Sequence, residues 1–362
     1  MSSTSVFPRI MAALATLALA LTGGISTAAA QSPITSSSTD DRGLFGEQDP
    51  SFDGVYRQSL SLLGLSSVGR QVPRAAVTWL VDQQCPNGSF ASYRADTLAP
   101  CPPADPNSFT GPDSNSTALA ALALMQVDRV REARRAMRWL VDQQRSDGGW
   151  AYLAGLDSDA SSTGLALAAM RTADIPRARV TKAPARAFIS TLIAGCDAPA
   201  GQRFGVGFQA GSPVDSFSSV HALLGLTGSL PVAAHKQYRG GPRVTCNAQG
   251  SPTKVPAAVS RWVISQFNAN DGSIPSSFVP GETDWNSTAL GIIGLVSSKF
   301  GGNATDIALS TLAANIDAYV VSSGDRPAAL GTTLLVATAT DSDPRDFGGS
   351  DLIQRLIDSM RR

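Results

Sequence analysis

The sequence repeats one short phrase four times: an aspartate, then serine and threonine residues, then a run of small and aliphatic residues. The copies are DSNSTALAALAL (113–124), DASSTGLALAAM (159–170), DSFSSVHALLGL (215–226) and DWNSTALGIIGL (284–295). Aspartate is a preferred residue at the N-cap of a helix, and the hydroxyls that follow can bond to backbone groups of the first turn. Each copy therefore predicts a helix that begins just after its aspartate. Because the runs are apolar on all sides, these helices are predicted to be buried.

A second phrase, in which tryptophan precedes glutamine and then Asp-Gly or Asn-Gly, alternates with the first. Its copies are WLVDQQCPNGSF (79–90), WLVDQQRSDGGW (139–150) and WVISQFNANDGSI (262–274). Trp and Gln four residues apart lie on one face of a helix, and the glycine accepts the left-handed conformation that ends it. Charge covers only one side of a segment such as REARRAMRWLVDQQ, so these helices are predicted to be amphipathic.

Together the two phrases predict six inner and six outer helices that alternate along the chain. The inner helices are expected at 54–65, 114–127, 160–173, 216–229, 286–298 and 328–339, and the outer helices at 74–84, 131–144, 182–195, 254–267, 304–321 and 347–361. A helix pair repeated every several tens of residues is typical of a closed or solenoidal array. We therefore expect an all-α fold, an (α/α)6 toroid. The first and last inner segments lack the aspartate signature.

The N-terminal region has the pattern of a secretory signal peptide. Residues 1–30 contain a basic residue, an apolar run and an Ala-x-Ala exit that ends at Ala30. We therefore expect cleavage near Ala30 and an extracellular product. Residues 31–50 are rich in Ser, Pro and charge and are predicted to be a disordered linker, which leaves 51–362 as the toroid domain. No later segment is long and apolar enough to span a membrane.

Four cysteines in an exported chain predict two disulfides. Cys85 and Cys101 bracket one proline-rich loop and are paired first, which leaves Cys196 for Cys246. Four cysteines allow three connectivities, so this pairing is a hypothesis. A zinc site needs a cluster of ligands, and the chain has only two histidines, so we expect no metal and no cofactor.

The phrase WLVDQQRSDGGW resembles the Gln-Trp repeat of the prenyltransferase and squalene-cyclase superfamily, whose members fold as (α/α)6 toroids. The resemblance extends over most of residues 54–361. It includes the toroid of the cobalamin carriers, intrinsic factor and transcobalamin, whose repeats also join an Asp-Ser/Thr turn to a helix rich in Ala and Leu. The resemblance implies the fold, whereas activity depends on the site.

The residues that carry the known chemistries of that superfamily are missing here. Cyclases of the squalene type protonate an alkene with the middle Asp of an Asp-x-Asp-Asp motif. The matching stretch reads DASST, with Asp159 first and Ser161 and Ser162 in place of the acid pair. A serine does not serve as a strong general acid. The zinc ligands of protein prenyltransferases and the Cys-Gly-Glu-Gln thioester of complement-like toroids are also absent. We therefore expect a non-catalytic ligand-binding protein.

If the inner helices are parallel, their N-terminal turns open on one mouth of the ring. Helix N-termini there favour anionic or strongly polar groups, and long Gly/Ser/Pro-rich loops on one side are typical of a binding face. His221 stands where the sister copies have leucine, either as a bonded core histidine or as a ligand contact. The residues expected at this site are Asp113, Asn115, Tyr152, Asp159, Phe208, Asp215, His221, Asp284, Trp285 and Asn286. The aspartates alone are also explained as helix caps.

Two other functions stay open. One is a structural toroid that binds a partner at the cell surface. The other is an enzyme, either a divergent terpenoid cyclase or prenyltransferase-like protein, or a hydrolase that uses carboxylates such as Asp159 and Asp284. The chain has 29 acidic and 29 basic residues, which gives no electrostatic reason to expect a nucleic acid or an anionic membrane as partner. The resemblance suggests a small apolar or corrin-like ligand.

Overall fold

The computed structural model describes residues 41–172, 176–228 and 230–362, so the predicted signal peptide lies outside the described residues. The described chain is mostly helical, as expected for an all-α fold. Its named strands, β1 (Trp150–Ala151) and β2 (Ser158–Asp159), form one short antiparallel pair.

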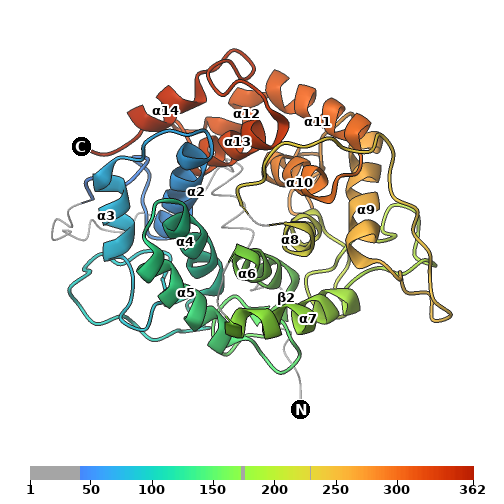
Figure 1. The fold of residues 1–362 in the computed structure, drawn as a ribbon, viewed down its shortest axis with the longest axis horizontal. Coiled ribbons are helices and arrows are strands. Elements are labelled where there is room, and N and C mark those ends of the chain that lie inside the picture. Colours follow the sequence, from blue (N-terminus) through green and yellow to red (C-terminus); the bar gives the residue numbers. More distant parts are fainter. Residues whose placement is uncertain (1–40, 173–175, 229) are drawn as a thin grey trace.

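The inner helices follow one another around a closed ring (Figure 1). They are α2 (Gly54–Ser67), α4 (Ser114–Gln126), α6 (Ala160–Thr172), α8 (Ser216–Thr227), α10 (Trp285–Ser298) and α13 (Pro327–Thr340). Each packs against the next, and α13 packs against α2. Each begins and ends within two residues of its predicted bounds.

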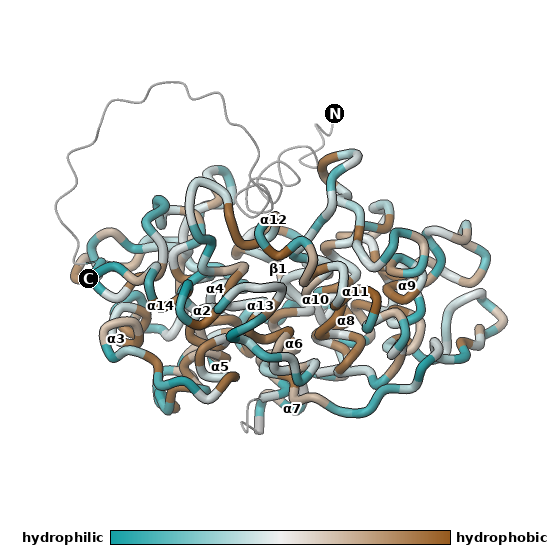
Figure 2. Tube along the Cα trace, turned by 90° about the horizontal axis from the view of Figure 1, so that it is seen from above, coloured by the Kyte–Doolittle hydropathy of each residue, from teal (hydrophilic) through white to brown (hydrophobic). Residues whose placement is uncertain are grey.

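The remaining helices lie outside this ring (Figure 1). They are α3 (Arg74–Asp82), α5 (Val130–Gln143), α7 (Pro176–Thr191), α9 (Val255–Ala269), α11 (Gly302–Ala314), α12 (Ile316–Val320) and α14 (Leu352–Asp358). Seen edge-on in Figure 2, the hydrophobic stretches lie mainly along the helices, and hydrophilic loops lie at both faces of the molecule.

Three predicted outer helices need correction. The segment 304–321 is divided at Asn315 into α11 and α12. The segment 182–195 is shifted toward the N-terminus, and α7 ends at Thr191 because Ile193 pairs with a neighbouring loop. The segment 347–361 forms only the short α14, because Asp351 caps it by accepting the N–H of the residue three positions later at 2.9 Å.

Glycines set the distance between neighbouring inner helices. A Cβ on Gly164 of α6 would overlap the carbonyl oxygen of His221 in α8. At the seam between the last and first repeats, a Cβ on Gly331 of α13 would overlap the carbonyl oxygen of Leu60 in α2. The absence of a side chain at these positions therefore lets the backbones of neighbouring helices come into contact.

The glutamines of the second phrase join successive outer helices. Nε2 of Gln84 donates to the carbonyl oxygens of Gly88 and Glu132, at 3.0 and 2.9 Å. Glu132 belongs to the next outer helix, and Gln144 makes the equivalent two bonds one repeat later. The glutamine that makes these bonds is the second of the two consecutive glutamines, five residues after the tryptophan. The third copy has Phe267 at that position and therefore lacks this link.

Residues 41–50, predicted as part of a disordered linker, pack against the domain instead. Leu44 and Phe45 are fully buried, and the N–H of Gly43 donates to the carbonyl oxygen of Arg361 at 2.9 Å. Burial of two adjacent apolar side chains stabilises the folded state, because it removes them from water. This explains why the segment is packed although its overall composition predicts disorder.

Both predicted cysteine pairs lie at disulfide distance. The Cα–Cα separation is 5.9 Å for Cys85 and Cys101 and 6.4 Å for Cys196 and Cys246. The first pair closes the loop before α4, and the second ties the loop after α7 to the segment before α9. Across the described ranges, no helix has the length and apolar character needed to cross a membrane.

The close approach of α6 and α8 predicts that Gly164→Ala destabilises the fold. The added methyl group meets backbone atoms that cannot rotate away, so we expect the free energy of unfolding to fall by about 1–3 kcal/mol. Chemical denaturation measures this. The control is Gly201→Ala, where a Cβ meets no atom within 4 Å and a change within about 0.5 kcal/mol is expected. Equal stability of the two variants would contradict this packing.

Candidate functional site

All four repeated aspartates cap an inner helix. The Oδ1 atoms of Asp113, Asp159, Asp215 and Asp284 accept the backbone N–H of the residue three positions later, at 2.7, 2.7, 2.7 and 2.8 Å. Each aspartate is buried. The capping explanation of the repeat is therefore correct, and each aspartate fixes the N-terminus of its helix at the mouth of the ring.

The residue four positions after each aspartate fastens the preceding loop to the helix. The hydroxyl oxygens of Thr117, Thr163, Ser219 and Thr288 accept the backbone N–H of Phe90, Trp150, Val206 and Ile274, each at 2.9 Å. These four loop residues are fully buried. The aromatic side chains of Phe90 and Trp150 are accordingly packing residues of the core rather than parts of an open mouth.

Helix geometry then assigns the residues that face the ring interior. Successive residues of an α-helix are rotated by about 100°, so the second and fourth residues after the aspartate lie on nearly opposite faces. The fourth bonds to the loop outside the ring, and the second therefore faces inward. The inward positions are Asn115 in α4, Ser161 in α6, Phe217 in α8 and Asn286 in α10. One turn further along, His221 replaces the leucine of its sister helices.

Five buried polar atoms at this end of the ring have no hydrogen-bond partner in the described structure. They are Oδ2 of Asp113, Oδ1 of Asn115, Oγ of Ser161, Oγ of Ser218 and Nε2 of His221. They come from α4, α6 and α8, which are consecutive in the ring. Buried polar groups in proteins are almost always bonded, so a group of five on adjacent helices marks the place where a ligand or water belongs.

His221 has one bonded and one free nitrogen. Its Nδ1 lies 2.8 Å from the carbonyl oxygen of Phe217, so the hydrogen is assigned to Nδ1 and Nε2 is an acceptor. Burial lowers the pKa of His221 to about 4, and the ring is neutral at neutral pH. The Phe217 ring packs edge-on against it with 4.4 Å between ring centroids. The interpretation of His221 as a bonded core histidine is therefore correct for Nδ1, whereas a ligand contact through Nε2 stays a prediction.

The aspartates do not contribute four full negative charges to the mouth. Burial raises the pKa of Asp113 and of Asp159 to about 7, against the opposing effect of the N–H groups that each carboxylate accepts. Burial likewise raises the pKa of Asp215 to about 6 and raises that of Asp284. The N–H groups at these helix ends already donate to aspartate, so the expected preference for anions does not follow.

The other predicted site residues are less uniform in their surroundings. Asn286 accepts a hydrogen bond from the Tyr319 hydroxyl at 3.1 Å, which brings α12 over the end of α10. Trp285, beside it, is half-buried. Tyr152, in the β1–β2 loop, is also half-buried, and burial raises its pKa. Phe208 belongs to a small apolar cluster apart from the main core.

Sequence reasoning did not single out Phe217, Ser218 or Tyr319. A usable signal existed for Phe217, because it replaces the Asn or Ser of the other copies at the inward position. Phe217 and Phe278 have ring centroids 6.1 Å apart and form the apolar cluster with Phe208. No such signal marked Tyr319, which comes from α12 and lies outside the repeated phrase.

The seam between the last and first repeats is built differently. Asp53 occupies the N-cap of α2 but pairs with Arg57 at 2.8 Å instead of capping the helix. The Arg57 guanidinium also donates to the carbonyl oxygen of Phe45 at 2.9 Å, which explains why this copy lacks the signature. No group of three His, Cys, Asp or Glu side chains suited to a metal ion occurs in the part of the chain that the structure describes.

No protein-family model matches the chain, and no curated protein matches it in sequence. Similar solved structures include ent-copalyl diphosphate synthase from Streptomyces platensis, at 14% identity and TM-score 0.49, over 78% of this chain and 50% of that one. A glycosidase matches at 13% identity and TM-score 0.48, over 93% of this chain and 98% of that one. A variant of the type II terpene cyclase MstE from Scytonema, solved with geranylgeranyl dihydroxybenzoate, matches at 12% identity and TM-score 0.46, over 85% and 80%.

These neighbours include terpene cyclases. The identities and TM-scores are low, so the likeness carries no conclusion about what this chain binds or catalyses.

The loop-fastening hydroxyls predict that Thr163→Val destabilises the protein. Valine has the same shape but leaves the buried N–H of Trp150 without an acceptor, at an expected cost of about 1–3 kcal/mol. In hydrogen exchange, the Trp150 amide should lose protection. Thr333→Val is the matched control, because that buried hydroxyl bonds to the carbonyl oxygen four residues back in its own helix. A control as unstable as the variant would refute the fastening role.

The raised aspartate pKa values predict a pH-dependent stability. A carboxyl group with a pKa of about 7 in the folded protein and about 4 when unfolded binds its proton more tightly when folded. The free energy of unfolding should therefore decrease as the pH rises from about 4 to about 7. Asp159→Asn keeps a capping residue but removes one titrating group, so its stability should depend less steeply on pH. Parallel pH profiles for the two proteins would contradict the buried-acid assignment.

Proposed function

We propose that this protein is a secreted (α/α)6 toroid that binds a small uncharged ligand at the N-terminal end of its inner ring, without catalysing a reaction on it. The observation that carries the proposal is the group of five buried polar atoms without partners on α4, α6 and α8. Two disulfides support export, because such bonds persist in oxidising compartments.

The unpartnered atoms define the chemistry of the ligand. Nε2 of His221 and the free oxygens of Asn115 and Asp113 are acceptors when the carboxyl group is ionised. Their natural complement is a ligand that brings O–H or N–H donors. An anionic ligand is disfavoured, because it would meet buried carboxylates and acceptor atoms in a desolvated site.

The same end of the ring offers apolar surface. Phe217 faces inward on α8, and Trp285 is half-buried at the start of α10. A ligand with one flat or apolar face and a donor-bearing edge satisfies both kinds of contact. The small apolar ligand expected from the sequence is thus narrowed to an amphipathic one, and a corrin-like molecule fits only through donor groups on its periphery.

The hydrogen bonds of Asp159 and Asp284 argue against acid catalysis by these two carboxylates. In Asp159 one oxygen accepts the Ser162 N–H at 2.7 Å and the other accepts the Ser162 hydroxyl at 2.8 Å. Asp284 is bonded in the same way to Ser287, at 2.8 and 2.6 Å. Both carboxylates are engaged as caps. Asp113 is the aspartate whose second oxygen is buried and unpartnered, so an enzyme would have to use that residue.

Native mass spectrometry of the protein purified from its own culture medium tests the proposal. We expect a stoichiometric co-purifying mass that leaves on denaturation. The protein is then incubated separately with glycan, isoprenoid and corrinoid pools, and the mass spectrum also reports conversion of any component. Protein that stays bare in all three pools contradicts the binding function. Turnover abolished by Asp113→Asn would replace it with an enzymatic one.

Substitution of the inward histidine separates ligand binding from stability. His221→Leu introduces the residue of the sister helices and removes an unpartnered buried nitrogen, so thermal stability without ligand should be unchanged or higher. Ligand affinity should fall by roughly tenfold or more, as expected for loss of one hydrogen bond of about 1.5 kcal/mol. The control is His235→Leu, because His235 bonds to the carbonyl oxygen of Val296 at the opposite end of α10. Unchanged affinity in His221→Leu would show that the histidine does not contact the ligand.

A further inference from the structure

The equal totals of acidic and basic residues conceal an uneven distribution. The connections that lead from inner to outer helices carry basic residues, among them Arg70, Arg129, Lys236, Arg239, Arg243 and Lys299. The connection from α13 to α14 is the exception and is mainly acidic, with Asp341, Asp343 and Asp346. The connections that lead back carry acidic ones, among them Asp96, Asp105, Asp147, Asp157, Asp197 and Glu282. Successive connections of each kind lie at the same end of the ring, so the two broad faces differ in charge.

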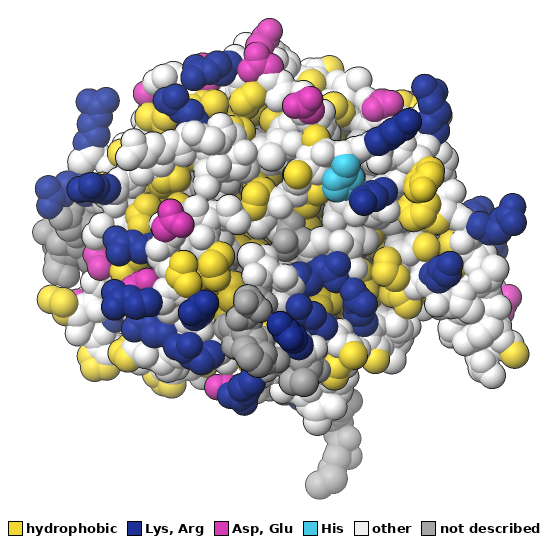
Figure 3. Space-filling view, viewed as in Figure 1, with side chains coloured by type: hydrophobic (Ala, Val, Ile, Leu, Met, Phe, Trp, Pro, Cys, Tyr) yellow, Lys and Arg dark blue, Asp and Glu magenta, His cyan; other side chains and the backbone are white. Residues whose placement is uncertain are grey.

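Figure 3 looks onto the face that carries the inner-to-outer connections. A histidine side chain is visible on this face in Figure 3. The connection from α8 to α9 carries the exposed His235, whereas His221 is fully buried. Lysine and arginine side chains are spread over much of this face, and acidic side chains are sparse over its lower half. We call it the basic face.

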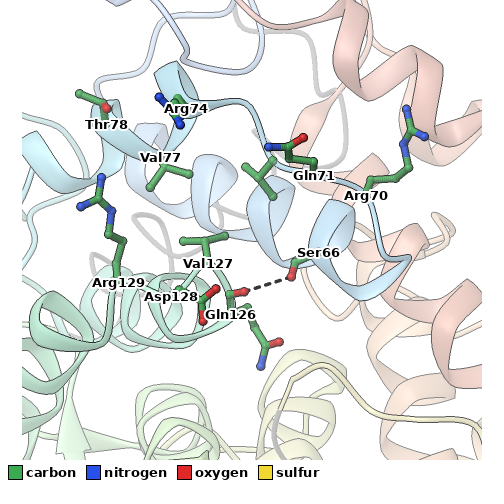
Figure 4. A pocket seen from close by; sticks show the side chains of 11 residues that line it. Ser66, Arg70, Gln71, Arg74, Val77, Thr78, Gln126, Val127, Asp128 and Arg129 are labelled. Carbon is green, nitrogen blue, oxygen red and sulfur yellow. Dashed lines mark hydrogen bonds between the residues drawn. The ribbon is translucent and has the colours of Figure 1, made fainter.

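A pocket of about 540 Å³ opens on the basic face, where α2 and α4 end and α3 and α5 begin (Figure 4). Arg70, Arg74 and Arg129 line it, together with one acidic residue, Asp128. The three arginines are exposed, and none of them forms an ion pair with another described residue. The pocket therefore holds a local excess of positive charge.

Two helix N-termini add to this charge. The N-cap residues of α3 and α5 are Pro73 and Arg129, and neither helix has a side-chain cap. No side chain accepts from their first N–H groups, and the helix dipole places partial positive charge there. The inner helices with capping aspartates show the reverse arrangement at the other face. Uncapped helix N-termini and guanidinium groups both attract phosphate groups, whose oxygens guanidinium binds in bidentate fashion.

Further cations surround this pocket across the basic face. Arg131, Arg134, Arg135 and Arg138 of α5 line a second cavity of about 480 Å³, together with the acidic Glu132. On α7, Lys182 lies close enough to Arg186 and to Arg171 of α6 that their repulsion adds to burial in lowering its pKa. This face is the broad one, because Figures 1 and 3 look along the shortest axis of the molecule. Positive charge spread over a broad face matches a planar array of anions better than a single small ligand.

An exposed aromatic side chain lies on the same face. Tyr238 is 70% exposed, and its N–H donates to the carbonyl oxygen of Lys299, which caps the C-terminal end of α10. Lys236 and Arg239 flank it in the chain. An amphipathic ring between cations is typical of proteins that contact the headgroup region of a bilayer.

We propose that the basic face docks on the anionic phospholipid surface of a membrane, with headgroup phosphates contacted by Arg70, Arg74 and Arg129 around the pocket. The contact is peripheral and electrostatic. It does not depend on the identity of the ligand in the ring, so each proposal is tested without the other.

Co-sedimentation with vesicles tests the docking. The protein should bind vesicles of phosphatidylcholine that contain phosphatidylglycerol, should not bind vesicles of phosphatidylcholine alone, and should dissociate as salt is raised. The triple variant Arg70→Gln, Arg74→Gln, Arg129→Gln should bind the anionic vesicles roughly tenfold or more weakly. The matched control is Arg145→Gln, Arg203→Gln, Arg362→Gln, which removes the same charge from the connections of the opposite face and the C-terminus and should bind like the wild type.

Three outcomes would overturn the docking proposal. Equal binding to both kinds of vesicle would show that anionic headgroups are not recognised. A control variant weakened as much as the pocket variant would show that total charge matters and the basic face does not. Binding of soluble polyphosphate without binding of vesicles would assign the cations to a phosphate polymer instead of a membrane.

Discussion

The hydrogen bond from a loop N–H to a hydroxyl in the first turn of an inner helix is the constraint on which the ring depends. It has the same length in four successive repeats and follows an aspartate cap each time. Because the hydroxyl fixes one side of the helix to the outer loop, the residue two positions earlier must face the interior. The four helices therefore share one rotation about their axes. The composition of the ring interior follows from that register.

Four inner helices were predictable because two independent signals agree: a capping residue at the start and an apolar run throughout. The helices α2 and α13 lack a side-chain cap and were predictable from the apolar run alone. The outer helices carry a weaker signal. The break at Asn315 between α11 and α12 has no proline or glycine to mark it, and α14 depends on one cap at Asp351. Composition alone predicts disorder for residues 41–50, which is wrong. Burial of Leu44 and Phe45 holds this segment against the domain although its other residues are mostly polar.

The repeated aspartates of the candidate site were predictable, but the atoms that are left without partners were not. Two serines follow Asp159 in series, and sequence does not distinguish them. In the structure Ser162 bonds to the aspartate, whereas the Ser161 hydroxyl is buried and unpartnered on the inward side. The same holds for His221, whose two nitrogens differ only because one reaches the carbonyl oxygen of Phe217. Hydrogen-bond satisfaction depends on rotamers and neighbours, which a repeat pattern does not specify.

The two faces of the ring differ in whether the helix N-termini are capped by a side chain. At the mouth, aspartates occupy the first N–H groups of the inner helices and leave acceptor atoms in the interior. At the basic face, α3 and α5 begin uncapped beside arginines and present donors. A molecule that rests on a membrane through its donor face turns its acceptor-lined mouth away from the lipid. The ring would then exchange ligand with the aqueous side, which agrees with a ligand that carries hydrogen-bond donors and partitions into water at least in part.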